Sequence, residues 1–319
     1  ATATKKVRAD IVERLRITEN RVFTKWFDRK NLIYIVREIT KEKEKLEKVL
    51  DIIQKTPPFW IVYCSSVKNV SKVYQYLLEN WVRVWIYTWE MQPNLRENEQ
   101  NNFMTWVYDV IVATNAFWMW IDKKDVRYVI HYNLPWSIEN YYQEAGRAWR
   151  DWKNSYSIVI ASYQDTIIQE FFIENTHPQK ETVLKLYDFL YKDFQIGDWN
   201  WHQILQTYAQ IASNAWLQSG MQVWTILKLF EKYNIVKRWF DAEDSDDFRG
   251  KWITLLSPKT TYDKIPILWH HQATLKQESY FKLEQVKKLL FKPGCRKKFI
   301  LEYFQDEEDL ALLTDNCGV

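Results

Sequence analysis

The most informative part of the chain is the stretch Ser137-Ile138-Glu139-Asn140-Tyr141-Tyr142-Gln143-Glu144-Ala145-Gly146-Arg147-Ala148-Trp149-Arg150-Asp151-Trp152. On a helix of about 3.6 residues per turn, Gln143, Arg147 and Arg150 fall on one face. Arginine keeps its charge near neutral pH and offers a fork of donors, so two arginines one turn apart suit a polyphosphate. The alternative is a solvated basic face whose arginines pair with carboxylates.

Short apolar runs alternate with amphipathic stretches on both sides of this segment. Strands of this length that alternate with helices indicate a parallel sheet with helices on both faces, which is an α/β fold. The apolar positions Val70, Val73, Tyr74 and Leu77 predict the inward face of one helix. The pattern predicts strands over 59–64, 82–87, 109–113, 126–132 and 157–162, and helices over 70–80, 94–104 and 138–148.

Hydroxyl side chains follow two of the predicted strands. Ser65 and Ser66 come after the first strand, and Thr114 follows a later one. Ligands of open α/β sheets collect at the carboxyl ends of the strands, so these hydroxyls could hold nucleic-acid phosphates. Ordinary capping of the helices that follow is an equally good explanation from the residues alone.

The amino-acid sequence of this region resembles that of one enzyme family. Val110 to Asp122 reads VIVATNAFWMWID and Asp125 to Pro135 reads DVRYVIHYNLP, and the arginine stretch follows. Together they resemble motifs V and VI of superfamily 2 helicases, and specifically the RecQ family, over about residues 58–165. The resemblance implies a second RecA-like motor domain of an ATP-dependent DNA helicase that unwinds duplexes 3′ to 5′ in recombination and repair.

The resemblance also implies roles for individual residues. Arg150 would be the arginine finger and Arg147 its partner, while Gln143 would position the nucleotide or the attacking water. Asp122 would connect motif V to the interface between motor domains, and Thr114, with Ser65, would contact DNA. ATP and Mg²⁺ would be shared with a first RecA-like domain of the same protein, and the DNA partner would be single strands and duplex junctions.

The sequence lacks two parts that ATP hydrolysis needs. It contains neither a Gly-x-x-x-x-Gly-Lys-Ser/Thr loop nor an Asp-Glu-x-His box, which would hold the phosphates and magnesium. We therefore expect the polypeptide to be inactive by itself. A non-catalytic DNA-binding or adaptor protein is the alternative, and an RNA helicase is less favoured because of the YYQE.GRA wording.

A separate pattern begins near residue 201. Ile204, Leu205, Tyr208 and Ile211 suggest one helix, and 223–230 a second, with strands over 235–240 and 252–256. This order resembles a winged helix, a common duplex-binding module. Lys228, Lys237 and Arg238 are the expected DNA contacts, although a winged helix that binds only protein is an alternative.

The last part resembles the start of a RecQ zinc module. Cys295 precedes a basic helix, and Cys317 lies near the end of the sequence. A closed Zn²⁺ site needs four ligands, so two thiols alone form at most part of one. The expected division is therefore a RecA-like domain over 1–175, a helical connector over 176–200, a winged helix over 201–260 and a helical segment over 261–319.

The composition predicts the compartment of the protein and the kind of partner it binds. The net charge is only +3, from 44 Lys and Arg against 41 Asp and Glu, so any nucleic-acid surface must be local. Three cysteines are too few for a disulfide framework. With no long apolar run, these features predict a cytoplasmic, nucleoid-associated protein, or a nuclear one in a eukaryote, with no membrane partner.

Tryptophan is unusually frequent and glycine unusually rare, at 18 against 6 residues. Trp81 stands between a predicted helix and strand, where turn chemistry favours glycine. In the RecQ pattern, glycines occupy four further positions that are tryptophan here: Trp118, Trp120, Trp149 and Trp152. The pattern predicts that tryptophan has replaced glycine systematically, at a cost in folding or binding.

Overall fold

The computed structural model describes residues 3–18, 28–88, 91, 102, 105, 107–114, 126–148, 153–197, 203–240, 251–305 and 310–311. The chain divides into two compact units. The first unit contains residues 1–167 and 281–319, and the second contains residues 168–280. Residues 281–319 thus belong to the first unit, and residues 261–280 to the second.

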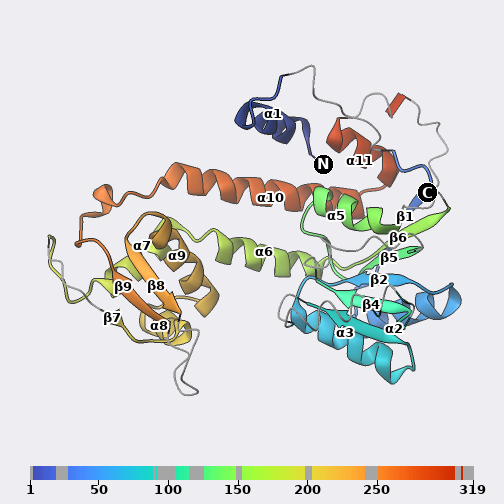
Figure 1. The fold of residues 1–319 in the computed structure, drawn as a ribbon, viewed down its shortest axis with the longest axis horizontal. Helices are drawn as coiled ribbons and strands as arrows, with labels where there is room; N and C mark the ends of the chain where they lie inside the picture. Colours follow the sequence, from blue (N-terminus) through green and yellow to red (C-terminus); the bar gives the residue numbers. More distant parts are fainter. Residues whose placement is uncertain are drawn as a thin grey trace. The chain divides into compact units, whose positions relative to one another are not determined.

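A parallel sheet forms the centre of the first unit (Figure 1). Its six described strands follow the order β1-β6-β5-β2-β4-β3. Every pair is parallel, and Trp60 of β2 lies in register with Val110 of β4 and Tyr128 of β5. The strands are β1 (Leu32–Glu38), β2 (Trp60–Tyr63), β3 (Val84–Tyr87), β4 (Val110–Ala113), β5 (Tyr128–His131) and β6 (Ser155–Ala161).

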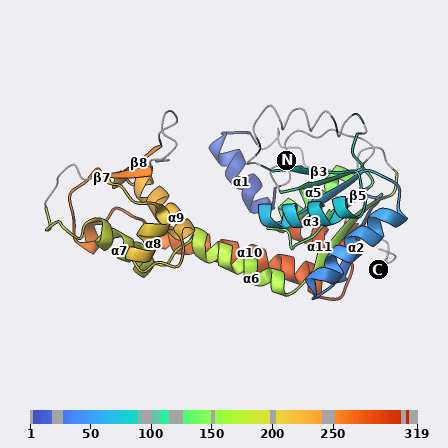
Figure 2. The same ribbon diagram turned by 90° about the horizontal axis from the view of Figure 1, so that it is seen from below.

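Helices cover both faces of this sheet (Figures 1 and 2). On one face, α2 (Glu42–Lys55) and α3 (Val67–Glu79) pack against side chains such as Val62 and Ile130. On the other, α5 (Ile138–Ala145), the end of α10 (Trp269–Phe291) and α11 (Arg296–Phe304) pack against side chains such as Ile61 and Val129. The alternation of side chains along each buried strand supplies both cores.

The predicted strands are present, each within a few residues of its expected bounds. Val70, Val73 and Leu77 of α3 are buried as expected, and Tyr74 packs at the edge of the same core. The sequence pattern had placed no element before residue 58, so it missed α1 (Lys5–Arg14), β1 and α2. The helix expected over 94–104 lies almost wholly outside the described residues.

The second unit combines helices with a small antiparallel sheet. Its strands β7 (Gln203–Ile204), β9 (Lys251–Leu255) and β8 (Val236–Phe240) pair in the order β7-β9-β8. Its helices α7 (Lys180–Leu190), α8 (Tyr208–Asn214) and α9 (Gly220–Lys232) share one core with these strands. α6 (Gln164–Thr176) enters this unit from the first.

One helix of the second unit starts later than the sequence suggested. Ile204 belongs to β7, Leu205 is exposed, and α8 begins only at Tyr208. The reason is a capping box, in which the Thr207 side chain accepts from the Gln210 N–H and the Gln210 side chain accepts from the Thr207 N–H. The order of helix, helix and hairpin matches the expectation.

Two tryptophans occupy turns that favour glycine. Trp81 follows α3 with φ of 60° and Trp216 follows α8 with φ of 55°, so both have left-handed backbone. Their side chains are 95% and 87% exposed. After α3, the Trp81 and Val82 N–H groups donate to Leu78 and Leu77 carbonyls, which is the Schellman pattern of helix ends.

None of the helices in the described part of the chain combines the length and apolarity needed to cross a bilayer.

Candidate nucleotide and nucleic-acid site

The arginine-bearing helix begins with a well-formed cap. The Ser137 side chain accepts a hydrogen bond from the Asn140 N–H at 3.2 Å. The α-helix ends at Ala145, earlier than the expected 148, and a 3-10 turn over Gly146–Ala148 continues it. Gln143 on the helix and Arg147 on the turn are both half-buried. Arg150 and Asp122 lie outside the described residues.

A buried hydrogen-bonded pair connects this helix to the sheet. His131 ends β5, and its Nε2 lies 2.9 Å from Oε2 of Glu144, which follows Gln143 on α5. The two side chains are only 2% and 7% exposed. The His131 ring also contacts the rings of Tyr63 and Tyr141. These contacts hold the buried side of α5 against the end of β5.

Arg29 is a contact of this helix that the sequence reading missed. Its Nη1 donates to the Tyr142 carbonyl at 2.7 Å, and its guanidinium carbon lies 3.8 Å from the centre of the Tyr142 ring. A cation near the C-terminus of a helix also interacts favourably with the helix dipole. A Cβ on Gly146 would lie 1.7 Å from Nη1 of the same guanidinium, so a larger residue there would displace the Arg29 side chain.

The pKa of Tyr63 reports the electrostatics around this helix. Burial raises the pKa well above its usual value, the Glu144 carboxylate raises it further, and Arg147 opposes both. The Tyr63 hydroxyl is therefore neutral at physiological pH. A small hollow at the strand ends is lined by Tyr63, Ser65, His131, Asn133 and Glu144, among others.

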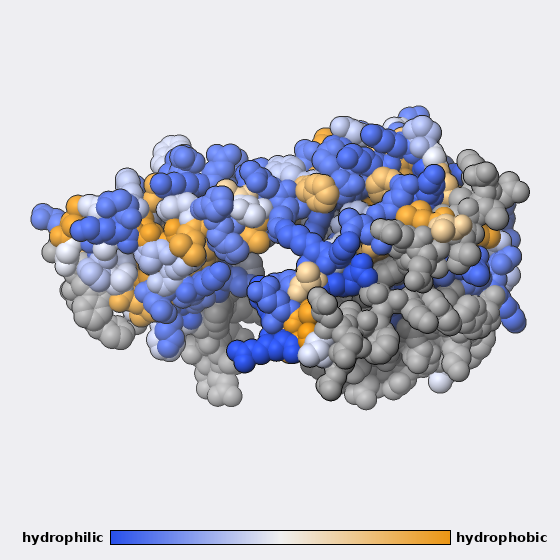
Figure 3. Space-filling model, turned by 90° about the horizontal axis from the view of Figure 1, so that it is seen from above, coloured by the Kyte–Doolittle hydropathy of each residue, from blue (hydrophilic) through white to orange (hydrophobic). Residues whose placement is uncertain are grey.

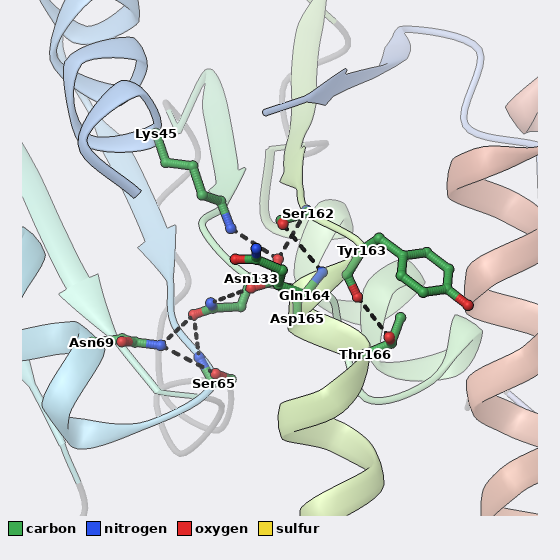
Figure 4. Close-up of polar contacts among 9 residues, drawn as sticks. All are labelled: Lys45, Ser65, Asn69, Asn133, Ser162, Tyr163, Gln164, Asp165 and Thr166. Atoms are coloured by element: carbon green, nitrogen blue, oxygen red, sulfur yellow. Dashed lines mark hydrogen bonds and ion pairs between the residues drawn. The ribbon is translucent and has the colours of Figure 1, made fainter. Parts of the chain in front are cut away.

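A second buried network joins the carboxyl ends of the strands (Figure 4). Lys45 of α2 lies 2.8 Å from Asp165 of α6, and their side chains are 5% and 8% exposed. Asn133 donates to Asp165 at 3.1 Å and accepts from the Ser65 N–H at 3.1 Å. Asn69 also donates to Asn133, at 2.9 Å. The network fixes the loop after β2 relative to the loop after β5.

The hydroxyl residues at the strand ends differ in their hydrogen bonds. Ser66 caps α3 by accepting from the Asn69 N–H, so the capping explanation holds for this residue. Ser65 is not the cap, and its backbone is held by Asn133. Thr114 is 7% exposed, and its Oγ1 has no hydrogen-bond partner among the described residues. Ser65 and Thr114 follow neighbouring strands, since β2 pairs with β4.

The basic residues of the second unit differ in exposure. Lys228 and Lys237 are exposed and lie over the Trp224 and Trp239 rings, at 5.1 and 3.7 Å. Arg238 instead pairs with Glu231 at 2.5 Å and is 9% exposed. Lys228 and Lys237 are therefore better placed than Arg238 to contact a phosphate.

The cysteines give little support for a metal centre. The Cys295 sulfur accepts a hydrogen bond from the Lys298 N–H at 3.4 Å, at the start of α11. Cys317 lies outside the described residues, and the described residues contain no group of three possible metal ligands. Cys64 is buried, and burial raises the pKa of its thiol, as expected for an inert core cysteine.

Comparisons with known proteins first define the class. Residues 44–151 match the helicase conserved C-terminal domain. The RecQ-like DNA helicase blm-1 of Caenorhabditis elegans is 40% identical over 176 residues, which are 54% of this chain and 18% of that protein. The ATP-dependent DNA helicase RecQ of Bacillus subtilis is 37% identical over 184 residues, which are 57% of this chain and 30% of that protein.

Among solved structures, the E. coli DEAD-box protein SrmB aligns with 44% of this chain and 83% of its own, at 19% identity and a TM-score of 0.41. Both sequence relatives are RecQ-type DNA helicases, in agreement with the motif sequences. Over more than half of its length this chain is similar to RecQ-type DNA helicases, and it contains a region that matches the helicase conserved C-terminal domain. It spans less than a third of the length of either relative.

Proposed function

We propose that this chain supplies the second motor domain of a 3′-to-5′ DNA helicase that couples ATP hydrolysis to strand separation. The main support is the way in which α5 is held. His131 and Arg29 fix its buried side and its C-terminal end, and Gln143 and Arg147 remain only half-buried. Rigid placement of a guanidinium suits a group that must meet charge developing on a transferred phosphoryl.

In this proposal ATP and Mg²⁺ bind between this domain and a first RecA-like domain. Bound Mg²⁺ would neutralise the charge on the phosphates. The residues present fit the arginine side of such a site, because Arg147 lies at the end of α5 with Arg150 three residues later. Arg150 would be the finger, Arg147 its partner, and Gln143 would orient the nucleotide or water.

DNA would bind through both units. The Ser65 and Thr114 hydroxyls lie at strand ends, where the unpartnered Thr114 Oγ1 suits a phosphate oxygen. In the second unit, which we interpret as a winged helix, Lys228 and Lys237 would contact the duplex backbone. A Zn²⁺ site that includes Cys295 and Cys317, and a role in recombination and repair, belong to the same proposal.

The test is to fuse the chain behind a first RecA-like domain that carries the phosphate loop and acidic box. We expect DNA-stimulated ATPase from the fusion and none from the chain alone. Loss of an arginine finger lowers the rate by about 10³ to 10⁵. Arg150→Ala should therefore abolish the stimulated rate and Arg147→Ala should reduce it strongly, while Arg14→Ala, an exposed control, should not.

Unwinding of duplexes with 3′ tails but not 5′ tails would establish the direction. Two results would contradict the proposal: a fusion no more active than the first domain alone, or equal rates for the Arg150→Ala and Arg14→Ala fusions. Stimulation by RNA instead of DNA would indicate an RNA helicase. DNA binding by the fusion without any ATPase would support the adaptor alternative.

A further inference from the structure

An open groove lies on the face of the sheet that α2 covers, away from the site described above. Its apolar lining comes from Ile35 of β1, Ile158 and Tyr156 of β6, Tyr128 of β5 and Ile52 of α2. The space within it that a water-sized sphere can reach is about 340 Å³. A groove of this size is comparable to ligand and peptide sites in other proteins.

The rim of the groove is basic. Arg37, Lys48 and Lys55 line it, and Asp51 is the acidic residue among the lining residues. Lys48 contacts Asp51 at 2.8 Å, and Lys55 contacts the same carboxylate. Hydrogen bonds from Lys48 and then Lys55 hold the pKa of Asp51 below its usual value, so this carboxylate stays charged. Three cations against one carboxylate favour an anionic occupant.

An unpaired strand edge runs along this groove. β1 stands at the end of the strand order and, within the described residues, pairs only with β6. The Asn31 carbonyl and the Ile39 N–H group hydrogen-bond to residues of β6 or next to it. Because backbone groups alternate in direction along a strand, the N–H and C=O groups of residues 33, 35 and 37 also face β6. The N–H groups of Tyr34 and Val36 therefore point away from β6, and the Val36 carbonyl accepts a hydrogen bond from Nη1 of Arg37 at 3.2 Å.

We propose that this groove and the β1 edge bind an acidic, extended segment of a partner protein. The segment adds as a strand beside β1, which gives its backbone the outward N–H groups of Tyr34 and Val36 as partners. Every second side chain then faces the groove, where carboxylates meet Arg37, Lys48 and Lys55. The apolar side chains between them face the other side of the sheet, beside Tyr34 and Val36.

A nucleobase suits the groove less well than a peptide. The Tyr128 and Tyr156 rings already stack on each other, with centres 5.4 Å apart and planes 12° apart, which leaves no room for a base between them. Basic side chains beside a sheet edge, such as Arg37 with Lys48 and Lys55 of α2, can also serve only to prevent aggregation. That explanation predicts no binding, so the experiment separates it from docking.

The test uses the whole chain and a fluorescein-labelled peptide, Ser-Glu-Phe-Asp-Ile-Glu-Val-Asp-Ser. We expect saturable binding with a Kd below about 100 μM by fluorescence anisotropy. Double charge reversal, Lys48→Glu with Lys55→Glu, should weaken binding at least tenfold. Reversal of Lys43 and Lys68, which are exposed lysines elsewhere on the same unit, changes the net charge equally and should leave binding within twofold.

Hydrogen exchange provides a second measurement that does not depend on substitutions. Bound peptide should slow exchange at the Tyr34 and Val36 amides and leave edge strand β3 unchanged. The proposal is overturned if no saturable binding appears below 1 mM, or if both charge reversals weaken binding equally. Displacement of the peptide by a single-stranded oligonucleotide, without effect of the Lys48 and Lys55 reversals, would also overturn it.

Discussion

Charged residues are arranged differently at the strand ends of the first unit and on the α9–β8 surface of the second. In the first, Lys45 and Asp165 are almost fully buried and contact each other directly, as do His131 and Glu144. In the second, Lys228 and Lys237 are exposed beside indole rings. Fixed, buried pairs suit chemistry that needs a defined geometry, whereas exposed cations suit a phosphate backbone of any sequence.

The largest effect should come from breaking the Lys45–Asp165 pair. Removing one partner leaves a buried, uncompensated charge, which costs about 3 to 5 kcal/mol. We therefore expect Lys45→Met to lower the free energy of unfolding of the first unit by about that amount, measured by denaturant titration. Asp165→Asn in the Lys45→Met background should cost much less than it does alone.

Lys43→Met is the matched control, because Lys43 lies on the same helix but is 86% exposed beside Glu47. An exposed pair contributes about 0 to 1 kcal/mol. Equal losses from Lys43→Met and Lys45→Met would show that burial does not distinguish the two sites.

The next largest effect on stability is expected from substitutions at Trp81 and Trp216, in one turn of each unit. An L-residue in the left-handed region costs about 1 to 2 kcal/mol, while glycine loses about 0.4 to 1 kcal/mol through its freer unfolded chain. Trp81→Gly and Trp216→Gly should therefore each stabilise by roughly 0.5 to 1 kcal/mol, because both indoles are exposed and little packing is lost.

The same substitution at Trp224 should change the stability in the opposite direction. Trp224 lies within α9, where glycine is unfavourable by about 1 kcal/mol relative to good helix formers. Thermal melting of the three variants should raise the midpoint for the two turn positions and lower it for Trp224→Gly. Three destabilised variants would mean that the turns have adapted to tryptophan.

The sequence predicted the sheet better than the site. Buried strands such as 110–113 are continuous apolar runs, which a sequence pattern detects, whereas β1 ends in the charged pair Arg37 and Glu38 and was not predicted. The motif spacing predicts site roles for Gln143 and Arg147, and these roles stay predictions. It could not identify Arg29, Lys45 or Asp165, because their partners are 113 and 120 residues away in sequence. Such contacts follow from the crossover topology rather than from any local pattern.

The exposed cations should change DNA binding more than stability. Each lost phosphate contact reduces the slope of log K against log salt by about 0.9 on duplex DNA. Lys228→Ala with Lys237→Ala should therefore weaken duplex binding and reduce that slope by about 2. Lys185→Ala with Lys264→Ala is the control within the same unit, and an identical slope for both pairs would place the DNA contacts elsewhere.

The smallest effect concerns acid sensitivity of the α6–α10 contact in the second unit. Glu174 accepts from Lys276 at 2.7 Å and from Tyr280 at 2.6 Å, and Ser279 lies 3.0 Å from His177. Burial opposes ionisation of Glu174, but the hydrogen bonds from Lys276 and Tyr280 outweigh it and lower its pKa. Burial also lowers the pKa of His177, with a further contribution from Lys276.

Both shifts act in the same direction on stability. The stabilisation by Glu174 is present above its unfolded pKa and is lost as pH falls through its lower folded pKa. His177 is held neutral, so acid favours the unfolded chain as pH falls below the ordinary histidine pKa of about 6.5. Because the Glu174 side chain is 38% exposed, solvent screens its pair and the loss should be small.

Glu174→Gln and His177→Asn separate these two contributions. Glu174→Gln should flatten the decline in stability below about pH 5, and His177→Asn the decline between about pH 7 and 5. The measurement is the unfolding midpoint of the second unit at a series of pH values. A midpoint whose decline with acid is unchanged in both variants would show that the α6–α10 contact does not report on pH, despite its two shifted groups.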